Sequence, residues 1–225
     1  MYLEATDRQG TPFTDRELLD ELVTLIVAGY ETSAGTLNWA WHLLARHPEA
    51  ADALCIEAAA YGPRLEKAAD DPGLAGLIFA QQVLDETLRL YPPVWLYTRR
   101  ALQDDVVEGI EIPADADIFL APFIMHRSAA FLQSSRNASS RSVSGRTDRT
   151  EGRRSAVLSL SLGPAPLPGR VLSRFWKKMK IHLGMLVQQF RLLPVTDAEP
   201  DLDLGINLRS AVDIYLQPEI RTPRT

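Results

Sequence analysis

One long apolar segment, residues 14 to 46, limits most strongly what this chain can fold into. Thr14 is followed three residues later by Glu17, the capping-box pattern that marks the first turn of a helix. Helical spacing of apolar residues continues to His47-Pro48, where proline disfavours helix in the residue before it. Because the apolar positions occur nearly all round the helix, we expect a core helix and not a surface helix. These positions are Leu18, Leu22, Leu25, Ile26, Val27, Ala28, Leu37, Trp39, Ala40, Trp41, Leu43 and Leu44.

The rest of the chain predicts shorter elements. Helices are expected at residues 49–60, 76–90 and 178–190, the second ending at Tyr91-Pro92-Pro93. Between residues 94 and 125, turn signals at Glu108-Gly109 and Pro113-Ala114-Asp115 separate short apolar runs, which predicts strands. Roughly the last thirty residues are expected to form short strands and loops. The predicted fold class is mainly α with a small β portion.

Composition excludes several classes of protein. The 225 residues, 46% hydrophobic and 24% charged, suffice for one domain or for part of a larger one. A net charge of -5 gives no reason to expect a nucleic-acid partner. A single cysteine excludes an internal disulfide and fits a reducing compartment. With no signal peptide and no apolar run long enough to span a bilayer, we expect a cytoplasmic protein without a membrane segment.

Residues 134–155 differ from the rest, since thirteen of these 22 residues are Ser or Arg. Such a stretch buries too little apolar area to order itself, so we expect disorder there. An Arg/Ser-rich RNA-binding segment is the alternative interpretation.

The long helix carries Ala28-Gly29-Tyr30-Glu31-Thr32-Ser33 in mid-run. A glycine costs a helix interior about 1 kcal/mol against alanine, and its benefit would be an open face for a flat ligand or small molecule. Thr32 can bond back to a carbonyl and loosen the turn, and Glu31 could hand protons to water held there. The alternative is a core helix in which the glycine only permits close packing.

A second motif is Glu86-Thr87-Leu88-Arg89, in which Glu86 and Arg89 share one face of a helix and can pair. Most such pairs lie on a solvated surface. A buried pair would need further hydrogen-bonding partners to offset its desolvation.

Taken together, the motifs and their spacing resemble the C-terminal half of a cytochrome P450. The central helix motif of that family matches Ala28 to Thr32, and its E-x-x-R motif matches Glu86 and Arg89. Further matches are Arg99 in Thr98-Arg99-Arg100-Ala101, Ile112-Pro113-Ala114 with Asp115 in place of the usual glycine, His126-Arg127, the helix from Met179 to Val195, and Asn207-Leu208-Arg209.

The resemblance implies the haem-proximal half of the P450 fold, present as one incomplete domain over residues 1–225. Residues 12–130 and 179–225 are family-like. The implied activity is a monooxygenase that uses haem b to insert one atom of O2 into a small organic substrate. Electrons would come from NAD(P)H through a redox partner.

The resemblance also assigns roles to residues. Glu31 and Thr32 would relay protons as the catalytic pair. Ala28, Gly29 and Thr32 would lie against the haem face, and Arg99 would bind a haem propionate. Glu86 and Arg89 would form a structural pair behind the loop that carries the iron ligand.

One block, residues 131–178, departs from the family and is expected to be disordered. Neither the P-E-R-F loop nor the cysteine-bearing F-x-x-G-x-R-x-C-x-G loop is present. The only cysteine, Cys55, lies far upstream, where a small buried residue is expected. His42, His47, His126 and His182 show no metal-ligand spacing, so no metal ligand is assigned.

A shifted reading frame would account for this block. Reading residues 158–172 one nucleotide later permits F-P-F-x-x-G-P-R-x-C-L-G-E-S-F, with cysteine in place of Leu167 and the family spacing at positions 160, 163, 165, 167 and 169. We therefore hypothesise that frame shifts or sequencing errors altered it. The alternative function is a non-catalytic, truncated remnant that binds no haem.

Overall fold

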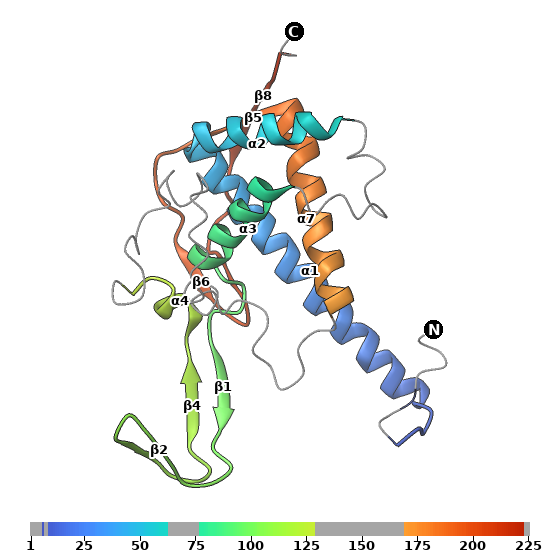
Figure 1. Ribbon diagram of the computed structural model, residues 1–225, viewed down its shortest axis with the longest axis vertical. Coiled ribbons are helices and arrows are strands. Elements are labelled where there is room, and N and C mark those ends of the chain that lie inside the picture. Colours follow the sequence, from blue (N-terminus) through green and yellow to red (C-terminus); the bar gives the residue numbers. More distant parts are fainter. Residues whose placement is uncertain (1–5, 7–8, 63–76, 129–168, 223–225) are drawn as a thin grey trace.

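The computed structural model describes residues 6, 9–62, 77–128 and 169–222. Its helical body consists of α1 (Asp15–Arg46), α2 (Pro48–Tyr61), α3 (Ile78–Leu90) and α7 (Gly169–Gln189), with α1 as the long diagonal helix in Figure 1. The mainly helical fold with a small β portion confirms the predicted fold class.

The first two helices begin and end where local sequence signals place them. The backbone N–H of Thr14 donates to Glu17 Oε2 (2.8 Å), and the N–H of Glu17 donates to Thr14 Oγ1 (3.3 Å). This capping box confirms the expected start of α1. His47 ends the helix, and Pro48 occupies the first turn of α2, where its missing N–H costs nothing.

The core lies where α2, α3 and α7 pack around the C-terminal half of α1. Small alanines on α2 let α7 approach closely, and leucines on α3 and α7 fill the space between the helices. The buried cluster is Ala40, Leu44, Ala50, Ala51, Leu54, Ala58, Leu77, Ala80, Val83, Leu84, Met179, Leu183 and Val187.

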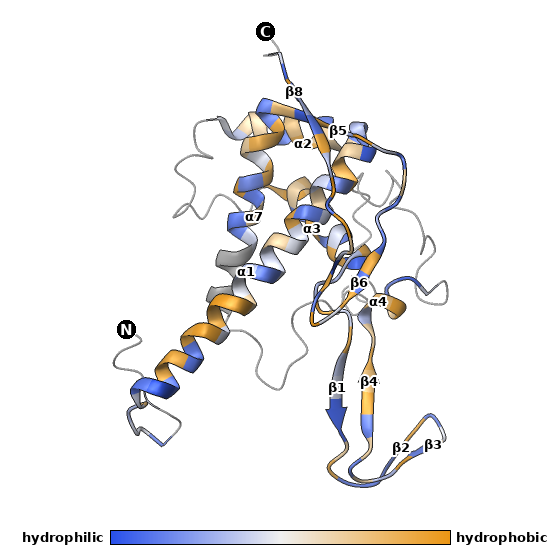
Figure 2. Ribbon diagram, turned by 180° about the vertical axis from the view of Figure 1, so that it is seen from behind, coloured by the Kyte–Doolittle hydropathy of each residue, from blue (hydrophilic) through white to orange (hydrophobic). Residues whose placement is uncertain are grey.

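The N-terminal half of α1 is not part of this core, which corrects the expectation of a helix buried throughout. Every residue from Leu19 to Tyr30 is exposed, whereas Trp39 and Ala40 are 1% and 0% exposed. Figure 2 shows apolar residues along this half of α1, which extends beyond the rest of the body. Apolar composition predicts that a face favours burial, but it does not predict which segment covers it.

The strands form antiparallel pairs, each a two-stranded sheet within the described residues. β1 (Tyr97–Arg100) pairs with β4 (Asp117–Leu120), and β2 (Asp105–Val107) pairs with β3 (Ile110–Ile112). After the short helix α4 (Pro122–Met125), the C-terminal part adds β5 (Phe190–Pro194) with β8 (Leu216–Ile220) and β6 (Leu202–Leu204) with β7 (Leu208–Ser210). The strands predicted between residues 94 and 125 and in the last thirty residues are therefore confirmed.

The last helix differs from the prediction, because α7 begins at Gly169 and not at residue 178. Residues 169–178 are thus helical, although they belong to the block expected to be disordered. The Arg/Ser-rich stretch and the rest of that block, residues 131–168, lie outside the described residues. Of the helices that are described, none has the length and apolar composition needed to cross a bilayer.

Candidate functional site

The middle of α1 presents three hydroxyl side chains that bond back to its own carbonyls. Thr32 Oγ1 donates to Ala28 O (2.6 Å), and Thr36 Oγ1 donates to Thr32 O (2.8 Å). Ser33 makes the same bond to Gly29 O. The predicted back-bond of Thr32 is therefore confirmed. Such bonds weaken the helix ladder locally and leave each hydroxyl oxygen able to accept a hydrogen bond.

Gly29 lies in open space on this segment. A Cβ built on it meets no other atom within 4 Å, so close helix packing does not explain this glycine in the described structure. Glu31 and Thr32 are half-buried, whereas Ala28 and Gly29 are exposed. The four residues form one accessible patch in mid-helix, as the open-face interpretation requires.

Glu31 lies within electrostatic range of Arg209 on the C-terminal hairpin β6–β7. The pKa of the Arg209 guanidinium on β7 is raised first by its hydrogen bond to Asp203 and, to a smaller extent, by the negative charge of Glu31. The charge of the predicted acid of α1 therefore acts on a basic residue about 180 residues further along the sequence.

The Glu86–Arg89 pair is buried, with side chains 11% and 8% exposed. Arg89 Nε and Nη2 donate to the two carboxylate oxygens of Glu86, each at 2.7 Å. Arg89 Nη1 donates to the carbonyl oxygen of His126 at 2.9 Å. The pair thus has the additional partner that burial demands, and it fixes α3 to the end of α4.

The start of α3 is held by a neighbouring helix. Leu77 offers no side-chain cap, and instead the Glu57 carboxylate of α2 accepts from Phe79 N (2.7 Å) and Ala80 N (2.9 Å). An anionic group at a helix N-terminus accepts hydrogen bonds from free N–H groups and interacts favourably with the positive end of the helix dipole. Glu57 therefore sets the position of the helix that carries Glu86 and Arg89, a role the sequence did not indicate.

Arg99 lies on β1, opposite Ile118 of β4, and its side chain is exposed. Its Nη1 donates to Thr98 O (2.9 Å), and its guanidinium lies 5.1 Å from the centroid of the Tyr97 ring. In Figure 1, β1 and the N-terminal half of α1 are separate extensions of the body. In the described chain, Arg99 therefore lies on the β1–β4 ribbon, whereas the accessible patch of Ala28, Gly29, Glu31 and Thr32 lies on α1.

The segment after α3 holds the β6–β7 hairpin in place. Sequence analysis did not predict this long-range contact. Trp95 Nε1 donates to Gly205 O (2.9 Å), and Leu208 N donates to Pro93 O (2.9 Å). The indole N–H of Trp95 therefore anchors the hairpin turn. Pro92-Pro93 was the available signal, since consecutive prolines keep this segment extended.

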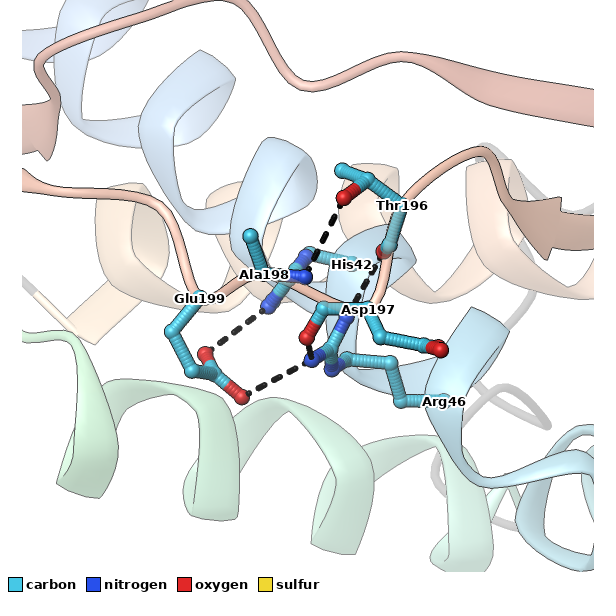
Figure 3. A network of polar contacts seen from close by, with 6 residues as sticks. All are labelled: His42, Arg46, Thr196, Asp197, Ala198 and Glu199. Atoms are coloured by element: carbon cyan, nitrogen blue, oxygen red, sulfur yellow. Dashed lines mark hydrogen bonds and ion pairs between the residues drawn. The ribbon is translucent and has the colours of Figure 1, made fainter.

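A second long-range tie, shown in Figure 3, joins α1 to residues 196–199. Glu199 lies 3.4 Å from the buried His42 ring and 3.3 Å from Arg46. Arg46 also donates to the carbonyls of Thr196 and Asp197. These contacts hold the segment leading into β6 against the buried end of α1.

Cys55 lies on α2, far in the sequence from the block in which the family resemblance places the iron ligand. It packs against the core cluster on α2, as expected, but it is only half-buried. Among the described histidines, His42 contacts Glu199, and His182 accepts a hydrogen bond from Trp41 (3.2 Å). Cys55 is thus part of the helical core, and the sequence contains no second cysteine that could supply a thiolate.

A comparison with models of protein families shows to which family this chain belongs. The model described as Cytochrome P450 matches residues 1–211. The chain belongs to the cytochrome P450 family. The family resemblance that the sequence motifs predicted is therefore confirmed.

Individual P450s match this chain over part of their length. Cyclooctatin synthase from Streptomyces melanosporofaciens is 38% identical over 58% of this chain and 28% of its own. Pentalenene oxygenase from Streptomyces avermitilis is 31% identical over 90% of this chain and 43% of its own. A solved cytochrome P450, CYP102L1, superposes with a TM-score of 0.80 at 25% identity, covering 98% of this chain and 49% of that one. The present chain therefore spans less than half the length of each of these relatives.

Proposed function

We propose that this chain is the haem-proximal portion of a monooxygenase that inserts one atom of O2 into a small organic substrate. Electrons would be supplied by an NAD(P)H-linked partner. Membership of the P450 family supports this proposal. The observation that carries it is the buried, bidentate Glu86–Arg89 pair, which stands where the family's structural pair is expected. Haem b is the cofactor that the family implies.

For the side chains we propose the roles that the motifs suggest. The accessible patch of Ala28 and Gly29 would lie against the haem face, and Arg99 would bind a propionate, which its exposed position permits. Glu31 and Thr32 would hold and pass protons, because the Thr32 hydroxyl is already oriented by Ala28 O and Glu31 is only half-buried.

We further propose that the chain, with the sequence it has, does not ligate haem through sulphur and is catalytically inactive. The sole cysteine is Cys55, which belongs to the helical core. A non-catalytic remnant that binds no haem is the second candidate function, and the same position of Cys55 favours it. The two candidates differ in whether the remaining framework can still accept haem once a cysteine is supplied.

A spectroscopic comparison tests both candidates. The purified chain is incubated with haem and reduced under carbon monoxide. We expect no haem-thiolate Soret band, and such a band from the unaltered chain would overturn the proposed inactivity. A second protein has residues 158–172 replaced by the shifted-frame sequence, which includes Leu167→Cys. A matched control carries the same replacement with Leu167→Ser.

The outcome of the matched pair separates a damaged monooxygenase from a remnant. A thiolate band in the Leu167→Cys protein that is missing from the Leu167→Ser protein supports the haem framework. No band in either supports the remnant. The gene sequence tests the frame hypothesis independently, since codons that exclude cysteine in the shifted frame contradict it.

A further inference from the structure

The connection between β5 and β6 is fastened to the buried end of α1 by residues 196–199, which we call the latch (Figure 3). Glu199 Oε2 lies 3.4 Å from His42 Nε2, and Glu199 Oε1 lies 3.3 Å from Arg46 Nη2. Arg46 also donates to two carbonyl oxygens of the same segment. Two side chains of α1 therefore hold one short stretch of backbone through a single carboxylate.

The latch is one of two attachments of the β6–β7 hairpin. It lies directly before β6 and holds the base of the hairpin. The turn is held separately, because Trp95 Nε1 donates to Gly205 O and Leu208 N donates to Pro93 O. The same hairpin carries Arg209, on which the charge of Glu31 acts. Opening of the latch would therefore release the base of this hairpin while the turn stays attached.

The two sides of the latch differ sharply in their access to water. The side chain of His42 is 3% exposed, whereas that of Glu199 is 66% exposed. Trp39 packs edge-on against the His42 ring, with centroids 5.7 Å apart and planes inclined by 86°. A second proton on this imidazole would place a full charge in a buried ring, which is costly. Glu199 offsets only part of that cost, because water screens an exposed carboxylate.

The charged groups around His42 do not reverse this balance. Burial is the largest influence and lowers the pKa of His42 below 6.5, the hydrogen bond and charge of Glu199 oppose it, and Arg46 and His47 on α1 add to the lowering. At the end of α3, burial and then the charge of Glu199 raise the pKa of Tyr91 above 10.0, so its phenol stays neutral. The charged groups of the other elements nearby have contacts of their own: His47 with Glu49 of α2, Arg191 of β5 with Asp52 of α2, and Arg127 with the rings of Tyr91 and Phe123.

We propose that the latch is sensitive to protons: uptake of a proton by His42 detaches residues 196–199 from α1 and releases the base of the β6–β7 hairpin, while the helical core stays folded. In the open state water reaches the imidazole, so its charged form is no longer penalised. One histidine with an ordinary pKa of 6.5 can raise the ratio of open to closed latch by at most about tenfold between about pH 7.5 and about pH 5.5. The inference goes beyond the proposed function and does not depend on haem.

Hydrogen exchange of the full 225-residue chain, followed by NMR, tests the proposal. Two amides report on the latch, since Val195 N donates to Tyr215 O (3.4 Å) and Ala198 N donates to Thr196 Oγ1 (3.2 Å). After correction for the intrinsic exchange rate at each pH, their opening equilibrium should rise by about threefold to about tenfold over this range. At every pH it should exceed that of the buried Leu54 amide of α2 at least about tenfold, which makes the opening local.

Three variants assign the effect. His42→Gln keeps an N–H donor for Glu199 but cannot take up the proton, so the opening equilibrium should vary by less than about twofold with pH. His182→Gln is the matched control, because the pKa of His182 is also lowered while its ring contacts Trp41 and not the latch, and the full response should remain. Glu199→Gln should raise the opening at least about threefold at pH 7.5, since it removes the charge that holds Arg46.

Several results would overturn the inference. One is a pH response that persists in His42→Gln, and another is latch amides that open no more often than Leu54. A third is an opening that falls on acidification, which would mean that attraction between the His42 imidazolium and Glu199 outweighs burial. Titration of the His42 imidazole by NMR in the unaltered chain tests the same point without a variant. A pKa below 6.5 is expected in the folded chain, and a value of 6.5 or higher contradicts the proposal.

Discussion

Trp39 of α1 stacks on Tyr91, the residue at which α3 ends, with ring centroids 3.9 Å apart and planes inclined by 3°. On α4's side, the Arg127 guanidinium lies 5.4 Å from the Tyr91 ring and 3.8 Å from the Phe123 ring. Aromatic and cation–π contacts thus form a continuous layer across α1, the end of α3 and α4. This layer fixes the direction in which the chain leaves the helix that carries Arg89.

Removal of the stack is expected to cost much of the stability of the domain. Trp39 is 1% exposed, so Trp39→Ala leaves a large cavity and should lower the free energy of unfolding by about 3–5 kcal/mol. Tyr91→Phe keeps the ring and should change it by less than about 1 kcal/mol. Urea unfolding followed by circular dichroism measures both. Equal effects of the two substitutions would show that ring stacking does not stabilise this junction.

Sequence analysis located the elements that depend on local signals. The start of α1 follows from Thr14 and Glu17, and its end from Pro48, because caps and prolines act within a few residues. The same analysis put the start of α7 too late, since residues 131–178 were treated as one altered block and Gly169 gave no cap signal.

Contacts between residues far apart in the chain could not be predicted from the sequence. Trp95 meets Gly205, and Asp52 of α2 binds both Arg191 and Arg221, more than a hundred residues further along the chain. Nothing in the spacing of these residues predicts contact, because tertiary packing alone brings them together. The exposure of Leu19 to Tyr30 was missed for a related reason. Apolar periodicity indicates that a helix face favours burial, but it does not show whether another segment covers that face.

The buried Glu86–Arg89 pair should be far more sensitive to substitution than an exposed pair. Arg89→Ala removes the bidentate partner of the buried Glu86 carboxylate and should lower the free energy of unfolding by about 3–5 kcal/mol. Arg100→Ala is the matched control, because the Arg100–Asp117 pair on β1 and β4 is exposed and should contribute less than about 1 kcal/mol. Chemical denaturation of the two variants provides the measurement. An Arg89→Ala protein as stable as Arg100→Ala would refute a structural role for the pair.

Asp115 stands where the family usually has glycine, and it has a φ of 62°, in the left-handed region that glycine adopts without strain. Asp115→Gly should therefore stabilise the turn between β3 and β4, by roughly 1 kcal/mol in the free energy of unfolding. Asp115→Val should do the opposite, because β-branched residues resist this conformation. Thermal unfolding of the two variants tests the argument. A glycine variant that melts below the valine variant would contradict it.

Acidification should weaken the fold through two buried histidines. Burial lowers the pKa of His42 below 6.5, although the neighbouring Glu199 opposes the shift and Arg46 and His47 add to it. Burial also lowers the pKa of His126, with smaller and mixed effects of Arg89, the Leu88 backbone and Arg127. In both cases the unfolded chain binds the proton more tightly than the folded chain does. The stability that these groups contribute is therefore complete above the unfolded pKa of 6.5 and is lost as the pH falls through the folded values.

We expect the free energy of unfolding to fall between about pH 7.5 and about pH 5.5, a range above that in which most carboxyl groups titrate, by about 1.4 kcal/mol for each unit of pKa depression that is traversed. Urea unfolding at several pH values measures the slope. The double variant His42→Gln/His126→Gln is the control, since it removes both imidazoles and should reduce the slope to what remains from His182, whose pKa is also lowered by burial, even if its overall stability is lower. An unaltered chain whose stability is constant or rises over this range would show that the two buried histidines are not linked to folding in this way.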